Sequence, residues 1–398
     1  MSEGFDPMLS VMAVRPPIYP VSTFAFRSAE QAAHCFEVAL GKMPAIPGED
    51  VGLIYARLNH PNAQMFEEAL CAVDKGAKAA AAFTSGMAAI TTTLLTLARP
   101  ATAVLYQRPV YGGTDHFLRH MLPEWNVEAV PVLDGDWQGA LDRHRQRLSV
   151  VYLETPANPT LQMIDLRALT GLVRKVVPGK VPVVVDNTFL GPVFQSPLQH
   201  GVDVAVYSAT KYLGGHSDLV AGALTSNDPE LVGRIKTTRA FLGTICEPFT
   251  AWMLQRSMAT LWLRTIKQSK NASKLVEAIK AHPAVAAVHY PTLFTGEQAR
   301  IFRQQCSAPG SMVALELHGG RAAAFRFLNA LRLVRLAVSL GGVESLACHP
   351  RTTTASEMSD DDLRIGGVTE GLVRLSIGVE YWRDLAADLT QALDAARG

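Results

Sequence analysis

Several features are scarce in this 398-residue chain, and each absence excludes a class of protein. The 37 basic and 36 acidic residues leave a formal net charge of +1, which gives no electrostatic case for binding nucleic acid or an anionic membrane. No apolar stretch approaches the ~20 residues that span a bilayer. The start of the chain has no basic segment followed by an apolar core, so we expect neither secretion nor membrane insertion.

Cysteine is also scarce. The five cysteines, Cys35, Cys71, Cys246, Cys306 and Cys348, are odd in number, scattered and free of any CxxC pair. Neither a disulfide framework nor a zinc site is indicated, and we expect no metal. The expected location is the reducing cytosol, and chemistry on a small molecule is the better default.

What is present is enough apolar sequence for a large core, since 48% of the residues are hydrophobic. Residues 1–60 are rich in proline and glycine, as in Arg15 to Pro20, and we expect an arm there. We expect a large domain over 61–250 and a C-terminal domain over 251–398.

Helical and strand patterns alternate through the middle of the chain. The expected helices are Ala63 to Val73 and Leu166 to Val177, and the expected strands are Thr102 to Tyr106, Val150 to Leu153, Val181 to Val185 and Asp203 to Val206. This alternation predicts a mostly parallel sheet covered by helices, an α/β fold. The run Ala77 to Ala82 mixes strand and helix signals.

A second pattern follows this alternation. From Pro229 to about His282 the chain is helical, and Ser311 to Leu317 and Leu372 to Ile377 are expected strands. We therefore predict a smaller C-terminal α+β domain.

The most informative segment is VYSATKYLGGHSD, from Val206 to Asp218, which places Lys211 directly after an apolar strand. A lysine held at a strand exit can lose its charge and become a nucleophilic amine. Ser208 and Thr210 add hydroxyls suited to phosphate oxygens. Although a strand-end lysine by itself is usually a solvated charge, the whole segment favours a pyridoxal phosphate site with a Schiff-base lysine.

Two further segments fit the same cofactor. Asp186 ends an apolar strand, where a carboxylate faces the ligand side of a parallel sheet and would suit a protonated pyridine nitrogen. Ser85, Gly86 and Met87 resemble a turn that opens a helix, where free amides face an anion. The alternatives are an Asp that caps the next turn and an ordinary helix N-cap.

Arg374 lies inside an apolar strand, so its charge needs a partner. A guanidinium fits a carboxylate through two hydrogen bonds, so Arg374 is a candidate for binding the carboxylate of a substrate. An internal salt bridge to an Asp or Glu is the alternative.

From about Pro16 to the C-terminus, the order and spacing of these motifs resemble the Cys/Met-metabolism enzymes that use pyridoxal phosphate, including cystathionine γ-synthases, cystathionine lyases and methionine γ-lyases. The resemblance implies the fold-type I, aspartate aminotransferase-like architecture. It assigns Lys211 to the Schiff base and Asp186 to the pyridine nitrogen. It also assigns a phosphate cradle, formed by Ser85, Gly86, Met87, Ser208 and Thr210.

The resemblance implies roles outside the cradle as well. Tyr111 stacks on the cofactor ring and exchanges a proton, and Asn158 bonds the phenolic oxygen of the cofactor. Ser339 and Arg374 hold the α-carboxylate of an amino acid substrate. His116 is a candidate ligand contact, although a loop histidine with a structural hydrogen bond is the alternative.

The resemblance further implies that active sites are shared between subunits. Tyr55 and Arg57, in the predicted arm, correspond to residues that reach the phosphate of a neighbouring subunit, and Tyr55 would also contact substrate. The expected assembly is a homotetramer, a dimer of dimers.

The expected reaction is γ-elimination from a γ-substituted L-amino acid, which gives a 2-oxo acid or another elimination product. The alternative is γ-replacement on an activated homoserine, as in cystathionine synthesis or sulfhydrylation, and β-elimination ranks third. A non-catalytic cofactor-binding protein is disfavoured because Lys211, Asp186, Tyr111 and Arg374 are all present.

Four positions bear on the choice of substrate. Gly113 replaces a cysteine typical of methionine γ-lyases, whereas Val338 is apolar, as in those enzymes. Asp115 and His116 stand where cystathionine-handling members commonly place an arginine. The leaving group stays open among a thiolate, a carboxylate, a halide and an oxygen-linked nitrogenous group.

Overall fold

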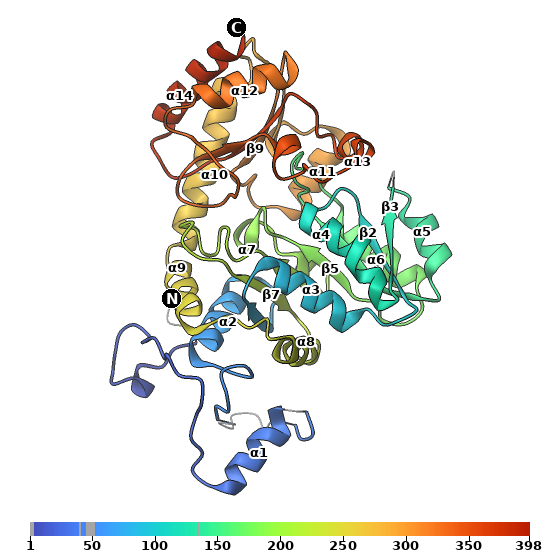
Figure 1. The fold of residues 1–398 in the computed structure, drawn as a ribbon, viewed down its shortest axis with the longest axis vertical. Helices are drawn as coiled ribbons and strands as arrows, with labels where there is room; N and C mark the ends of the chain where they lie inside the picture. Colours follow the sequence, from blue (N-terminus) through green and yellow to red (C-terminus); the bar gives the residue numbers. More distant parts are fainter. Residues whose placement is uncertain (1–3, 40, 45–51, 134) are drawn as a thin grey trace.

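The structure, a computed structural model, describes residues 4–39, 41–44, 52–133 and 135–398. Parts of the predicted arm, residues 1–3, 40 and 45–51, therefore lie outside the described residues. The rest extends from the body and carries helix α1 (Ala29–Ala39), at the end of the molecule opposite the C-terminus (Figure 1). Trp252 attaches the arm to the body, since its indole N–H donates to the Pro16 carbonyl at 2.8 Å.

A seven-stranded sheet forms the centre of the body, in the order β1-β7-β6-β5-β4-β2-β3. Its strands are β1 (Ala79–Phe83), β2 (Ala103–Gln107), β3 (Glu128–Val132), β4 (Leu148–Glu154), β5 (Val183–Asp186), β6 (Val204–Tyr207) and β7 (Gly222–Ser226). β7 runs antiparallel to both neighbours, and all other adjacent pairs are parallel. The predicted mostly parallel sheet is confirmed.

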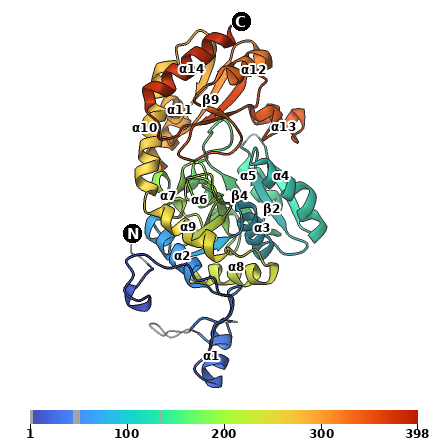
Figure 2. The ribbon, with the colours of Figure 1, turned by 60° about the vertical axis from the view of Figure 1, so that its left-hand side comes forward.

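Helices cover both faces of this sheet (Figure 2). Alternate residues of β2 show why: Val104 and Tyr106 pack in the cluster with α3 and α8, whereas Leu105 packs with α5 and α6. The helices of this part are α2 (Pro61–Val73), α3 (Gly86–Leu97), α4 (Gly112–His116), α5 (Trp137–His144), α6 (Leu166–Val176), α7 (Gly191–Phe194) and α8 (Pro229–Leu242). A strand buried on both faces is apolar throughout, which explains the continuous hydrophobic runs.

The elements predicted from sequence lie within a few residues of those observed. The ambiguous alanine run is strand β1, in which Ala80 and Ala82 pack on the side of α2 and Ala81 on the side of α3. The helical stretch after Pro229 is three helices, α8, α9 (Pro248–Met258) and α10 (Leu261–Ile279). α8 ends at Leu242, and Gly243 caps it with a φ of +74°, a conformation that favours glycine.

A second sheet, of five strands in the order β10-β11-β12-β9-β8, forms the predicted smaller C-terminal part. Its strands are β8 (Val285–His289), β9 (Met312–Leu317), β10 (Arg335–Leu336), β11 (Leu346–Cys348) and β12 (Leu372–Ser376), and its other helices are α11 (Gly296–Gln305), α12 (Gly320–Ala330), α13 (Asp360–Ile365) and α14 (Trp382–Ala396). α10, α12 and α14 pack on this sheet around Phe327 and Leu389. The long α10 runs from the body into this part (Figure 1).

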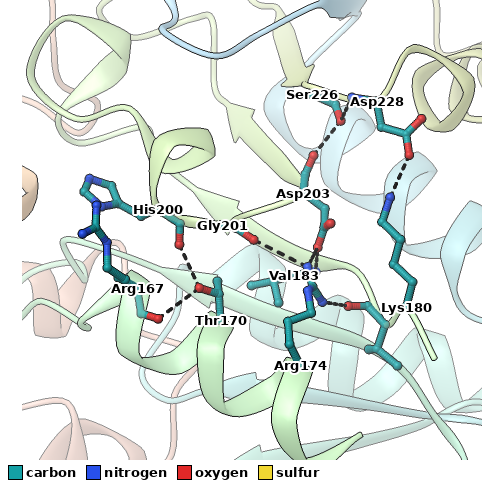
Figure 3. A network of polar contacts seen from close by, with 11 residues as sticks. Arg167, Thr170, Arg174, Lys180, Val183, His200, Gly201, Asp203, Ser226 and Asp228 are labelled. Carbon is teal, nitrogen blue, oxygen red and sulfur yellow. Dashed lines mark hydrogen bonds and ion pairs between the residues drawn. The ribbon is translucent and has the colours of Figure 1, made fainter. Parts of the chain in front are cut away.

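A polar network fastens α6 to the edge of the large sheet where β5 and β6 begin (Figure 3). Arg174 of α6 pairs with the Asp203 carboxylate, which also accepts the Val183 amide at 2.7 Å. Ser226 Oγ donates to the Asp203 carbonyl at 2.6 Å. The charges of Arg174 and Asp203 neutralise each other at this end of the strands. The opposite, carboxyl ends of the strands are left for ligands. Within the described ranges, no helix is long and apolar enough to cross a membrane.

Candidate active site

A cavity of about 560 Å³ opens at the carboxyl edge of the parallel strands. Parallel α/β sheets bind ligands at this edge. Segments from both sheets line the cavity, and most of the residues predicted from sequence are among them: Ser85, Gly86, Met87, Tyr111, Asn158, Asp186, Ser208, Thr210, Lys211, Ser339 and Arg374. Residues separated by up to 289 positions in the chain are thus brought together, since Ser85 and Arg374 line the same space.

Lys211 lies in the turn that follows β6. Its Nζ donates a hydrogen bond to Ser339 Oγ at 2.7 Å. Burial, with a smaller contribution from the positive charge of Arg374, lowers the pKa of Lys211 to about 8. The neutral form of this amine is therefore more abundant near neutral pH than in an ordinary lysine, which suits a nucleophile that captures an aldehyde.

The start of α3 forms an anion cradle. Ser85 caps the helix, its Oγ accepting the Ala88 amide at 3.0 Å, and the first amides of any helix lack partners within it. A Cβ on Gly86 would lie 2.9 Å from Ser208 Cβ, so glycine allows α3 to approach the turn before Lys211. Thr210 Oγ1 lies at the same cavity but exchanges hydrogen bonds with the amide and carbonyl of Ala221.

Two buried carboxylates stand side by side at the cavity. Glu154 ends β4 and Asp186 ends β5, and the two residues are register partners. Asp186 accepts hydrogen bonds from the amide and hydroxyl of Thr188, at 2.9 and 2.6 Å. Burial raises the pKa of Asp186, and burial together with the charge of Asp186 raises the pKa of Glu154 to about 8.

No ion pair links either carboxylate to a Lys, Arg or His in the described part of the chain. Buried carboxylates need a compensating charge, so Asp186, which stands beside Glu154, suits a cationic ring nitrogen. With the Lys211 amine and the α3 anion cradle in one cavity, the residues present fit pyridoxal phosphate. The described residues contain no cluster of three or more His, Cys, Asp or Glu suited to a metal.

Arg374 reaches the cavity from β12 of the second sheet and is 4% exposed. Its Nη1 donates to Asn158 Oδ1 at 3.2 Å, and its Nη2 donates to the Ser339 carbonyl at 3.1 Å. The internal salt bridge considered from sequence is not found among the described residues. Neutral oxygens leave the positive charge of Arg374 available to a carboxylate.

Tyr111 lines the cavity as the residue before α4, and 43% of it is exposed. Exposure of an aromatic ring in a cavity allows a flat ligand to stack on it.

Three predicted site residues do not line this cavity. Arg57 donates to the Ala240 carbonyl at 2.8 Å and stacks on the Tyr55 ring, both on the side of α8. His116 lines a neighbouring cavity of about 310 Å³, where its Nδ1 lies 4.0 Å from the Glu357 carboxylate. Asp115, the residue before His116, is buried, and its Oδ2 pairs with Arg119 Nη1 at 3.3 Å.

Sequence reasoning missed Glu154. It was visible as a carboxylate directly after an apolar strand, the same signal that drew attention to Asp186. It also missed Thr353 and Thr354, which line the cavity from the C-terminal part. No sequence signal pointed to these threonines, because only the packing of the two sheets brings them to the site.

Comparisons with known proteins identify relatives of this chain. The sequence model described as Cys/Met metabolism PLP-dependent enzyme matches residues 3–394. The chain is 40% identical over 395 residues to an L-methionine gamma-lyase of Pseudomonas putida, covering 99% of this chain and 96% of the relative. It is 38% identical over 392 residues to a cystathionine gamma-synthase of Mycobacterium bovis, covering 98% and 94%.

A solved structure shows that the similarity to this group of enzymes extends to the fold. Cystathionine gamma synthase from Xanthomonas oryzae pv. oryzae, in complex with cystathionine, superposes with a TM-score of 0.88 at 32% identity, covering 98% of this chain and 95% of that one. The fold is that of the fold-type I enzymes. The chain therefore belongs to the Cys/Met metabolism family of pyridoxal-phosphate-dependent enzymes, the γ-lyases and γ-synthases.

Proposed function

We propose that this enzyme catalyses γ-elimination on a γ-substituted L-amino acid, in which water is consumed and the γ-substituent, ammonia and a 2-oxo acid are released. The observation that carries the proposal is the placement of the Lys211 amine 2.7 Å from Ser339, with Arg374 bonded to the carbonyl of the same serine. The Lys211 base and the carboxylate-binding Arg374 guanidinium thus both form hydrogen bonds to Ser339. This is the arrangement that an amino acid needs when its carboxylate is held and its Cα proton is removed.

Each residue of the cavity has a role in this proposal. Pyridoxal phosphate, when bound, supplies an electron sink that stabilises negative charge on the substrate carbons. Asp186 would hold its ring nitrogen, and the α3 cradle with Ser208 and Thr210 would hold its phosphate. Asn158 would hold its phenolic oxygen.

The proton transfers fall to two residues. The Lys211 amine would take the proton from Cα, pass it to the exocyclic carbon of the cofactor, and then take a proton from Cβ. Both acceptances need the neutral amine, which the lowered pKa of Lys211 makes available near neutral pH. Tyr111 hydroxyl donates a proton to the leaving group on Cγ. Arg374 and Ser339 hold the α-carboxylate, so that these protons point at their acceptors.

The lining beyond these groups is largely apolar. Val338 is 54% exposed and lies at the cavity with Val220 and Met87. An apolar wall favours a thiolate leaving group that carries a small alkyl group over a substituent that carries a second carboxylate. A halide or an oxygen-linked nitrogenous group stays chemically accessible.

γ-Replacement on an activated homoserine is the second candidate, and the 38% identity to a cystathionine gamma-synthase favours it. Both reactions require the same groups up to departure of the γ-substituent, so they differ only in whether an external nucleophile enters. The cavity in the isolated chain admits either course.

The test is to incubate the holoenzyme with a panel of γ-substituted L-amino acids, with and without L-cysteine, and to identify products by mass spectrometry. We expect 2-oxobutanoate or another free elimination product regardless of cysteine. A cysteine-dependent adduct as the main product would establish replacement instead.

We also propose that Tyr55 and Arg57 act in the active site of a neighbouring subunit of a homotetramer. Support comes from their position outside the cavity of their own chain, in the arm that extends from the body (Figure 1). As the location we propose the reducing cytosol.

A further inference from the structure

Glu154 differs from the other buried acids near it. Glu67 pairs with Lys236 and Arg239, and Asp203 pairs with Arg174. Glu154 is 5% exposed and stands beside another carboxylate, with no basic partner in the described ranges. Retaining a carboxylate there is unfavourable unless its oxygens are engaged in hydrogen bonds.

Both oxygens are engaged, and each bonds a different loop. Glu154 Oε2 accepts the Tyr111 amide at 2.6 Å, and Oε1 accepts the Asn158 amide at 2.9 Å. The amide of Glu154 itself donates to Gln107 Oε1 at 3.1 Å, at the end of β2. The side chain therefore ties the loop after β2 to the loop after β4.

Each of these two loops carries a residue that lines the cavity. One loop carries Tyr111, and the other carries Asn158, whose Oδ1 accepts a hydrogen bond from Arg374. Displacement of either amide from Glu154 would move the ring of Tyr111 or release the contact that orients Arg374. A misplacement of about 1 Å in such groups can cost roughly a hundredfold in rate.

We infer that Glu154 is a positioning residue, whose carboxylate sets the placement of Tyr111 relative to Asn158 and its partner Arg374. This inference rests on the proposed function for the roles of Tyr111 and Arg374. Glu154 itself touches neither substrate nor reacting atoms in this assignment, and it acts through the two amides that it binds.

Glu154→Gln is the decisive variant. Glutamine keeps the shape but has one acceptor oxygen, so its Nε2 faces one of the two amide donors. The substitution also removes the repulsion from Asp186, so the protein should keep its thermal stability while the two loops shift. A matched control is Asp388→Asn in α14, because Asp388 accepts the amides of Arg332, Leu333 and Val334, and none of these residues lines the cavity.

The measurement uses holoenzyme and L-alanine, which has no γ-carbon and cannot undergo γ-elimination. Binding of L-alanine is followed by the change in cofactor absorbance, and ring orientation by the circular dichroism that the protein induces in the cofactor. For Glu154→Gln we expect L-alanine affinity to fall by about tenfold or more, with altered dichroism and a melting temperature near that of the parent. For Asp388→Asn we expect a lower melting temperature with unchanged L-alanine affinity and dichroism.

Unchanged dichroism and L-alanine affinity within about twofold of the parent would overturn the inference and leave Glu154 a structural residue. A double variant adds a second check. Because Glu154 acts on Arg374 through Asn158, Glu154→Gln should weaken L-alanine binding much less in an Asn158→Ala background, and additive losses would also overturn the inference.

Two further precautions keep the test decisive. If Glu154→Gln does not fold, Glu154→Asp replaces it, since the shorter side chain keeps the charge but cannot reach both amides. If the parent enzyme binds L-alanine yet eliminates no γ-substituent from any amino acid, the proposed reaction fails while the L-alanine readout still decides the role of Glu154.

Discussion

The Lys211 amine and the Ser339 hydroxyl form a hydrogen bond of 2.7 Å between Nζ and Oγ, and this bond connects the turn after β6 to the C-terminal part. Ser339 has a φ of +87°, a left-handed conformation that is strained for a residue with a side chain. Its carbonyl accepts Arg374 Nη2, so hydrogen bonds from both parts of the fold hold the serine in place. Lysine and arginine are thus positioned by one residue.

Replacement of Lys211 by alanine should abolish turnover while cofactor stays weakly bound, because the cradle at α3 and Asp186 remain. Product formation and cofactor absorbance after dialysis measure the two effects. Lys180→Ala is the control, since Lys180 forms a pair with Asp228 at the other edge of the sheet. Substantial turnover by Lys211→Ala would mean that another group performs the chemistry.

The lowered pKa of Lys211 predicts how cofactor capture depends on pH. Only the neutral amine attacks an aldehyde, and burial lowers the pKa of Lys211 to about 8. The rate at which apoprotein captures pyridoxal phosphate should therefore rise with pH up to about 8 and then level off, as stopped-flow absorbance would show. A rate that keeps rising to the ordinary lysine range, near 10.4, would show that Lys211 is protonated like an exposed lysine.

Arg374→Lys should lower kcat/KM for an amino acid substrate by about a hundredfold, because lysine cannot make two parallel hydrogen bonds to a carboxylate. The loss should appear mainly as a raised KM, with cofactor affinity unchanged, and steady-state kinetics measure both. Arg321→Lys is a matched control, as Arg321 makes a surface pair with Glu370. An equal KM for parent and Arg374→Lys would exclude carboxylate binding by Arg374.

Mixing two inactive variants tests the shared active site. If Arg57 serves the site of a neighbouring subunit, Arg57→Ala subunits reassembled with Lys211→Ala subunits should regain part of the activity, since some sites then receive both intact residues. Mixed oligomers are verified by mass spectrometry of the intact assembly. Confirmed mixed oligomers without activity would exclude a shared active site that Arg57 completes.

Local sequence patterns predicted much of the fold. Apolar runs bounded by turn residues predicted β2, β4, β5 and β6 within a few residues, since strands buried on both faces must be apolar throughout. The alanine run at β1 was ambiguous, because alanine suits both helix and strand. The run forms a strand because its alternate alanines pack against α2 on one face and α3 on the other.

The candidate site divides in the same way. Lys211, Asp186 and the Ser85 to Met87 turn were found because each stands at the junction of a strand or helix with a loop, a place that a linear pattern reveals. Glu154 was passed over, although it stands at an equivalent junction, because its importance depends on its two amide partners in distant loops.

The sequence by itself therefore determined the fold class, the family and most candidate site residues on the large sheet, though not Glu154, because strand periodicity and motif spacing are local properties of the chain. Only the tertiary structure decided which groups meet. Arg374 faces Asn158, Ser339 bonds Lys211, and Glu154 stands beside Asp186. These contacts arise from the register of neighbouring strands and the packing of one sheet against the other, which depend on residues far apart in the chain.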